Sequence, residues 1–146
     1  MRTGLVVLAF MLAACGRSEE PAAEAQAQSS AASGAATLTV YAGTGRNRLC
    51  LDQRASRAAF ITYGEGDTNC TARGNLEREG STATLVPDGD ESCRIAFAAN
   101  GDSVTLGPVS PSCSYYCGPK ASFAGAEFRR TNDQQPVTDL AGAPLC

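Results

Sequence analysis

The stretch Asn69-Cys-Thr-Ala-Arg-Gly-Asn-Leu-Glu-Arg78 decides the fold, because its side chains alternate strictly in character. Small or apolar residues occupy every second position, namely Cys70, Ala72, Gly74 and Leu76. Polar residues occupy the positions between them, namely Thr71, Arg73, Asn75 and Glu77. A period of two residues is that of a β-strand with one buried face. The stretch therefore predicts a strand that packs against a core.

The same pattern recurs on both sides of this stretch, in short pieces separated by glycine-containing turns. Short strands at regular spacing, without a convincing helix between them, are typical of an all-β sandwich or barrel. Short turns favour antiparallel neighbours, and eight such strands can close into a small barrel without free edges. We therefore predict a small antiparallel barrel of about eight strands, at residues 37–42, 47–52, 57–63, 69–78, 81–87, 92–98, 102–107 and 121–130.

The last of these segments breaks the alternation. Phe123 and Phe128 lie five positions apart and would point to opposite faces of an unbroken strand. Gly125 lies between them and permits a β-bulge. We expect such a bulge to turn both rings inward.

The chain ahead of the barrel indicates export. Residues 1–14 contain one basic residue and an uncharged apolar run that is too short to span a membrane, as in a signal peptide. Leu12-Ala13-Ala14-Cys15 is similar to the lipobox of bacterial lipoproteins, in which the cysteine receives the lipid. This resemblance implies diacylglycerol on Cys15, cleavage before it, and an acyl anchor in the membrane. In enterobacterial lipoproteins, Asp after the lipidated cysteine favours retention at the inner membrane. Position 16 is Gly, so the resemblance implies the outer membrane, facing the periplasm.

A low-complexity segment follows Cys15. Residues 16–36 contain Ala, Ser, Gln and Glu but no large apolar side chain. Such a composition cannot bury enough surface to offset its ordering entropy. We predict three parts: a signal peptide (residues 1–14), the lipidated cysteine with a flexible tether (15–36), and one barrel domain (37–146).

Cysteine parity supports the exported location. Seven cysteines leave six after lipidation of Cys15, and an even set in a small periplasmic domain predicts three disulfides. We expect Cys113 to pair with Cys117 across one tight loop. Cys146 is expected to pin the tail, residues 131–145, to the barrel. The candidates for its partner and for the remaining bridge are Cys50, Cys70 and Cys93.

The composition argues against several kinds of chemistry. Without any histidine the usual general base is missing, and one close cysteine pair does not form a zinc site. Lys120 and Ser122 remain as a formal catalytic pair, and the acidic turn Asp88-Gly-Asp-Glu91 is interpreted as a solvated turn. A net charge of −3 without a basic stripe argues against nucleic acid. We predict a non-catalytic protein without metal or cofactor.

The lipobox, the tether and a disulfide-bonded barrel ending in SFAGAEFRR together resemble small bacterial envelope lipoproteins, including the membrane-bound lysozyme inhibitors. In that family an eight-stranded barrel inserts a loop into the lysozyme cleft, where a serine and a lysine engage the catalytic carboxylates. The family's Ser-Gly and Trp-Lys-Gly segments are not in this chain, which has no tryptophan. No functional residue is therefore carried over from it.

The stretch CSYYCGPKASFAG (113–125) is the candidate binding loop. It contains Tyr115, Tyr116, Lys120 and Ser122, and aromatic anchors on a rigid loop suit docking to a periplasmic protein. In the alternative interpretation the tyrosines plug the barrel mouth and Lys120 is merely solvated. A structural lipoprotein without a soluble ligand is a second alternative. A barrel that carries a small ligand is a third, although side chains nearly fill the interior of eight strands.

Overall fold

The computed structural model describes residues 38–80, 82–133 and 135–146. The predicted signal peptide, Cys15 and the tether lie outside these residues.

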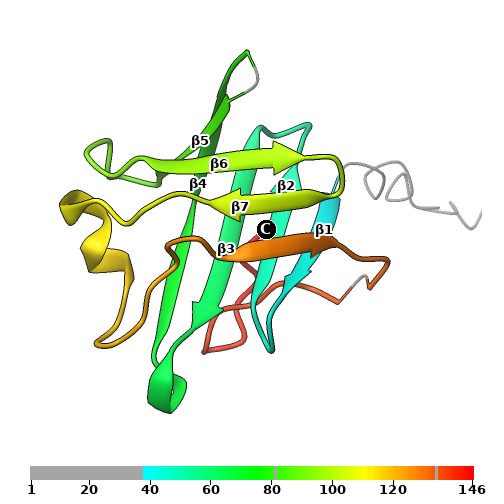
Figure 1. Ribbon diagram of the computed structural model, residues 1–146. Helices are drawn as coiled ribbons and strands as arrows, with labels where there is room; N and C mark the ends of the chain where they lie inside the picture. The colour runs from blue at the N-terminus through cyan, green and yellow to red at the C-terminus, as the bar shows by residue number, and fades with distance from the viewer. Residues whose placement is uncertain (1–37, 81, 134) are drawn as a thin grey trace, which may run out of the picture. The chain divides into compact units, whose positions relative to one another are not determined.

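Eight antiparallel strands form a closed barrel in sequence order (Figure 1). Each strand pairs with the next, and the last pairs with the first through Tyr41 and Arg130. This confirms the predicted all-β barrel. The strands are β1 (Leu38–Gly43), β2 (Arg48–Asp52), β3 (Arg57–Tyr63), β4 (Asn69–Glu79), β5 (Thr82–Pro87), β6 (Ile95–Asn100), β7 (Ser103–Leu106) and β8 (Glu127–Arg130).

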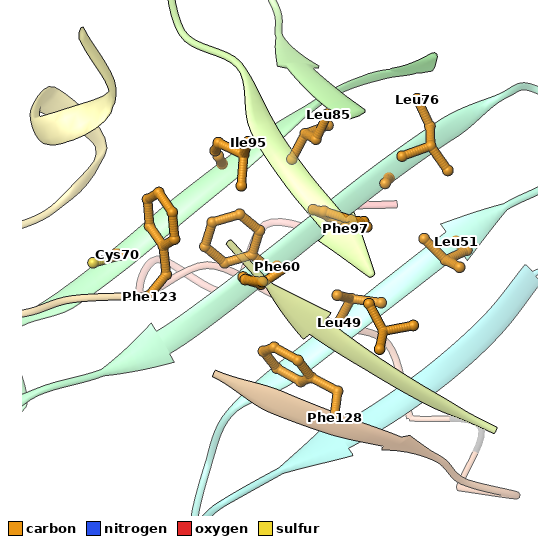
Figure 2. Close-up of a cluster of buried hydrophobic side chains, with 14 of the residues drawn as sticks. Leu49, Leu51, Phe60, Cys70, Leu76, Leu85, Ile95, Phe97, Phe123 and Phe128 are labelled. Carbon is orange, nitrogen blue, oxygen red and sulfur yellow. The ribbon is translucent and has the colours of Figure 1, made fainter. Parts of the chain in front are cut away.

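The alternation of β4 has the predicted result. Cys70, Ala72 and Leu76 are buried, whereas the polar residues between them are half-buried or exposed. The inner face of the barrel is filled with apolar side chains, which Figure 2 shows converging from several strands. Its largest fully buried members include Leu49, Phe60, Leu85, Ile95, Phe123 and Phe128.

Gly125 forms the predicted bulge. Its backbone φ is +66°, and its N–H donates to the carbonyl of Leu106 at 3.0 Å. The Leu106 N–H donates in turn to the carbonyl of Ala126, so two residues oppose one, as in a G1 bulge. Phe123 and Phe128 consequently both point into the core and are 0 % exposed.

Two strands, β6 and β8, begin at least three residues later than the sequence predicts. β6 begins at Ile95 and not at residue 92, because the Asp90 carboxylate accepts hydrogen bonds from the N–H groups of Ser92 and Cys93. β8 begins at Glu127, after the turn at Gly125. The described residues also contain two short 3₁₀ turns, η2 (Glu65–Asp67) and η3 (Pro111–Tyr116).

The C-terminal tail covers the outside of the barrel. Val137 and Leu145 pack on Val40 and Ile61, which belong to the outer faces of β1 and β3, and form a second apolar cluster. A disulfide joins Cys146 to Cys50 across 96 positions of sequence. The prediction that Cys146 pins the tail to the barrel is confirmed, and Cys50 is its partner.

The predicted bridge between Cys113 and Cys117 is wrong. Cys113 pairs with Cys93, and Cys117 pairs with Cys70. Cys113 lies within the 3₁₀ turn and Cys117 ends it. With three residues per turn, side chains four positions apart point in different directions, so each cysteine faces a different segment.

The connections after β1, β3, β5 and β7 lie at one end of the barrel, because consecutive strands are antiparallel. We call this the loop end; it comprises residues 44–47, 64–68, 88–94 and 107–126. Leu38, where the described chain enters β1, pairs with Asp52 at the opposite end. The longest connection, residues 107–126, contains η3 and the candidate binding loop.

Candidate functional site

The η3 turn is held to the barrel on both sides. The Cys93–Cys113 bridge ties it to the β5–β6 connection, and the Cys70–Cys117 bridge ties it to the start of β4. The Gly118 N–H also donates to the carbonyl of Asn69 at 2.8 Å. In Figure 1 the turn is the yellow coil beside the connection between β5 and β6. Covalent links on both sides leave the backbone of this turn little freedom.

The two tyrosines of this turn have different environments. Tyr115 is 89 % exposed, whereas Tyr116 is half-buried and packs against the core. The Tyr116 hydroxyl donates to Asp90 Oδ2 at 3.2 Å. Their ring centroids lie 5.7 Å apart with an interplanar angle of 87°, an edge-to-face contact. Tyr116 therefore supports Tyr115 from one side and leaves its ring accessible to a partner.

Asp90 accepts several hydrogen bonds within the connection between β5 and β6, which lies beside Tyr116. Its Oδ1 accepts hydrogen bonds from the Ser92 N–H at 3.0 Å and from the Ser92 hydroxyl at 2.5 Å. The Ser92 hydroxyl is the strongest cause that lowers the pKa of the Asp90 carboxyl. Burial, followed by the charge of Asp90, raises the pKa of the Tyr116 phenol. Asp90 therefore acts as an ionised brace between the acidic turn and η3.

Asp88 in the same turn is bound to a strand. Arg57 donates to both of its carboxylate oxygens, at 2.7 and 2.5 Å, and the nearest Arg73 nitrogen lies 3.9 Å away. The hydrogen bonds from Arg57 are the main cause that lowers the pKa of Asp88. The acidic turn is therefore exposed to solvent, as predicted, and Arg57 and Ser92 also hold its two aspartates in place.

Lys120 and Ser122 occupy separate settings. Lys120 has a φ of +62°, and its Nζ lies 3.9 Å from Glu65 Oε2, with both side chains exposed. The Ser122 hydroxyl accepts a hydrogen bond from the Ala124 N–H at 3.1 Å. In the described part of the chain, no hydrogen bond or ion pair joins Lys120 or Ser122 to the tyrosines or to each other. The four candidate residues therefore belong to one connection but do not form one constellation.

The sequence prediction missed Asp90 and Arg57 as parts of this region. The spacing Asp90-x-Ser92 is the local signal for Asp90, since an Asp side chain commonly binds the backbone two residues further on. For Arg57 no local signal exists, because its partner Asp88 is 31 positions away.

All six cysteines of the domain are in disulfides, so none offers a thiolate. Within residues 38–80, 82–133 and 135–146, no three Cys, Asp or Glu side chains are placed to share a metal ion. The same ranges contain no helix with the length and apolar character needed to cross a membrane.

No protein-family model, curated protein or solved structure matches the chain.

Proposed function

We propose that this chain is an envelope lipoprotein, anchored through Cys15 in the outer membrane and facing the periplasm, whose barrel is a non-catalytic module that binds a protein. The observation that carries the proposal is Tyr115, an 89 % exposed aromatic side chain on a turn fixed by two disulfides. Tyrosine is among the residues that contribute most to protein–protein binding. A turn that is already rigid loses little conformational entropy when a partner docks.

Two features of the fold support binding at the surface. The inner face is packed with side chains that are almost fully buried, which leaves little room for a ligand inside the barrel. The loop end also lies opposite the end at which the chain enters β1 at Leu38. A domain attached through its N-terminal side would therefore have Tyr115 at the end away from its attachment.

The anchor is tested separately from binding. We expect mass spectrometry of the purified full chain to find diacylglycerol on Cys15, and membrane fractionation to place the chain in the outer-membrane pellet. Replacement of Cys15 by serine removes the thiol that would receive the lipid and should release the chain into the soluble fraction. A wild-type chain that is already soluble would contradict the lipoprotein assignment.

Tyr115→Ala should weaken protein binding by about thirtyfold, which corresponds to the roughly 2 kcal/mol typical of an interface hot spot. The matched control is Leu140→Ala, which removes another exposed apolar side chain, 62 % exposed, in the tail. Lysozyme is the first partner to test, by its residual activity at excess full chain carrying Cys15→Ser.

The lysozyme assay has two informative outcomes. Inhibition that Tyr115→Ala relieves and Leu140→Ala leaves intact supports an inhibitor. Full lysozyme activity at excess chain rejects the inhibitor version, and cross-linking to envelope proteins then tests binding in general. A set of cross-linked partners identical for wild type and Tyr115→Ala would reject the binding module itself.

A further inference from the structure

The bridge between Cys50 and Cys146 differs from the other two disulfides in its surroundings. Cys146 is exposed to solvent, and Cys50 lies on the outer face of β2. The cysteines of the other two bridges belong to the inner core or pack against it, namely Cys70, Cys93, Cys113 and Cys117. Three of these four are at most 1 % exposed. The Cys50–Cys146 bridge is therefore the one that a reductant reaches most easily, and exposed disulfides are the labile ones.

Cys50 lies at the centre of an apolar surface beneath the tail. The strand register places Val40 opposite Cys50, and Cys50 opposite Ala59, so the three form a line across β1, β2 and β3. Together with Ile61 they are at most 4 % exposed, although they belong to the outer face of the barrel. The tail therefore covers an apolar surface that solvent would otherwise reach.

The tail has few other attachments to the barrel. The Leu145 N–H donates to the carbonyl of Val137 at 2.8 Å, and the Asp139 N–H donates to the carbonyl of Ala143 at 2.9 Å, so these bonds join the tail to itself. In the parts of the chain that the structure describes, no hydrogen bond or ion pair joins residues 137–146 to a strand. Burial of Val137 and Leu145 alone does not offset the conformational entropy of ordering this segment. The disulfide is therefore its main attachment.

Reduction has a different consequence at this bridge than at the other two. Once the tail leaves the barrel, the thiols of Cys50 and Cys146 move apart, and their low effective concentration disfavours closure. The two core bridges lie where the barrel would keep reduced thiols together. An antiparallel backbone pair, for example, holds Cys70 beside Cys117. The core bridges should therefore re-form under conditions that leave Cys50 and Cys146 reduced.

We propose that the Cys50–Cys146 bridge is a thiol–disulfide exchange site, at which a dithiol reductant releases the tail. A thiolate of the dithiol attacks Cys146 Sγ, the bond to Cys50 Sγ breaks, and Cys50 leaves as a thiolate that takes up a proton. The second thiol of the reductant then displaces Cys146, which also takes up a proton. The dithiol is oxidised to a disulfide, and its two protons pass to the two reduced cysteines.

Release of the tail uncovers the apolar surface formed by Val40, Ala59 and Ile61. The bridge thus acts as a redox-sensitive switch between a covered and an uncovered outer face. This inference goes beyond the proposed function, because it requires neither a lipid on Cys15 nor a protein partner at Tyr115.

The test uses the full chain with Cys15→Ser in buffers with increasing ratios of reduced to oxidised dithiothreitol. After an acid quench, free thiols are alkylated in urea and located by mass spectrometry of peptides. We expect Cys50 and Cys146 to be reduced together, at a ratio at least about tenfold below that of the four core cysteines, because only this pair separates on reduction. Hydrogen exchange of the Leu145 amide should accelerate over the same range, while the amides of β4 stay protected.

Two tail variants separate packing from accessibility. Val137→Ala removes part of the packing that holds the tail, so its bridge should be half reduced at a ratio about tenfold lower than in the parent chain. Leu140→Ala is the matched control, because Leu140 is 62 % exposed in the same tail, and its ratio should be unchanged. Cys146→Ser cannot form the bridge, and its Leu145 amide should exchange rapidly without any reductant.

The proposal is overturned if all three bridges open at the same ratio, or if a core bridge opens first. It is equally overturned if the Leu145 amide stays protected after Cys50 and Cys146 are reduced, or in Cys146→Ser, because the tail would then stay in place without its disulfide. Equal ratios for Val137→Ala and Leu140→Ala would show that packing of the tail does not control the bridge.

Discussion

Gly74→Ala is expected to lower the free energy of unfolding by more than about 3 kcal/mol, above the roughly 1 to 3 kcal/mol that overpacking a core usually costs. A Cβ atom on Gly74 would lie 1.9 Å from the carbonyl oxygen of Val86 and 2.7 Å from the Cα of Pro87. Both obstacles are backbone atoms, so no side-chain rotation relieves the clash. β4 and β5 would have to separate at the point where Gly74 pairs with Pro87.

Urea unfolding followed by circular dichroism measures this effect. Gly118→Ala is the matched control, because a Cβ there would meet its nearest neighbour, the carbonyl of Asn69, at an ordinary contact distance of 3.5 Å. The control should change stability by less than about 1 kcal/mol, within the range of most mild substitutions. Equal midpoints for the two variants would show that β4 and β5 do not approach as closely as described.

Gly74 also shows what the sequence could and could not predict. Its place in the alternation predicted an inward-facing position, and the strand is buried there. The need for glycine at that position follows from β5, whose distance from β4 no local pattern contains. Periodicity thus predicts which face a residue belongs to, while the space available to it depends on the partner strand.

For the disulfides, too, the sequence predicted one property, their number, but not another, their pairing. Cysteine parity predicted three bridges, and three are present. Sequence distance then favoured the short loop between Cys113 and Cys117, which is wrong because the 3₁₀ turn points the two side chains apart. The pairing depends on where Cys70 and Cys93 lie after the barrel has closed. Spacing gives the size of a possible loop but not the direction of its side chains.

The candidate binding loop was predicted in part. The pattern of residues 113–125 indicated a rigid loop with aromatic anchors, and two disulfides do hold this segment. Adjacent tyrosines look equivalent in the sequence, yet only Tyr115 is fully accessible, since Asp90 holds Tyr116. The hydrogen bonds that join Arg57 to Asn75 and Asp88 were not predicted, because these residues come from different strands and connections.

Phe123→Ala is expected to cost about 3 to 5 kcal/mol of unfolding free energy, the usual cost of truncating a buried phenylalanine. Phe123 is 0 % exposed although it lies in the connection before β8, and its ring meets Phe60 edge to face at a centroid distance of 5.3 Å (Figure 2). Such aromatic pairs add to the free energy of burial. The substitution would leave a cavity beside Phe60 and release the segment that contains Lys120 and Ser122 from the core.

Two matched variants separate these effects in urea unfolding. Phe123→Leu keeps an apolar side chain in the site and should cost less than Phe123→Ala, because the remaining cavity is smaller. Tyr115→Ala, in the same connection but exposed, should stay within about 0.5 kcal/mol of wild type.

Hydrogen exchange of the Gly125 amide, which donates to the carbonyl of Leu106 beside Phe123, should accelerate in Phe123→Ala. If Phe123→Ala proves no more costly than Tyr115→Ala, Phe123 does not anchor this connection to the core. The stability of the Tyr115 turn would then depend on its two disulfides.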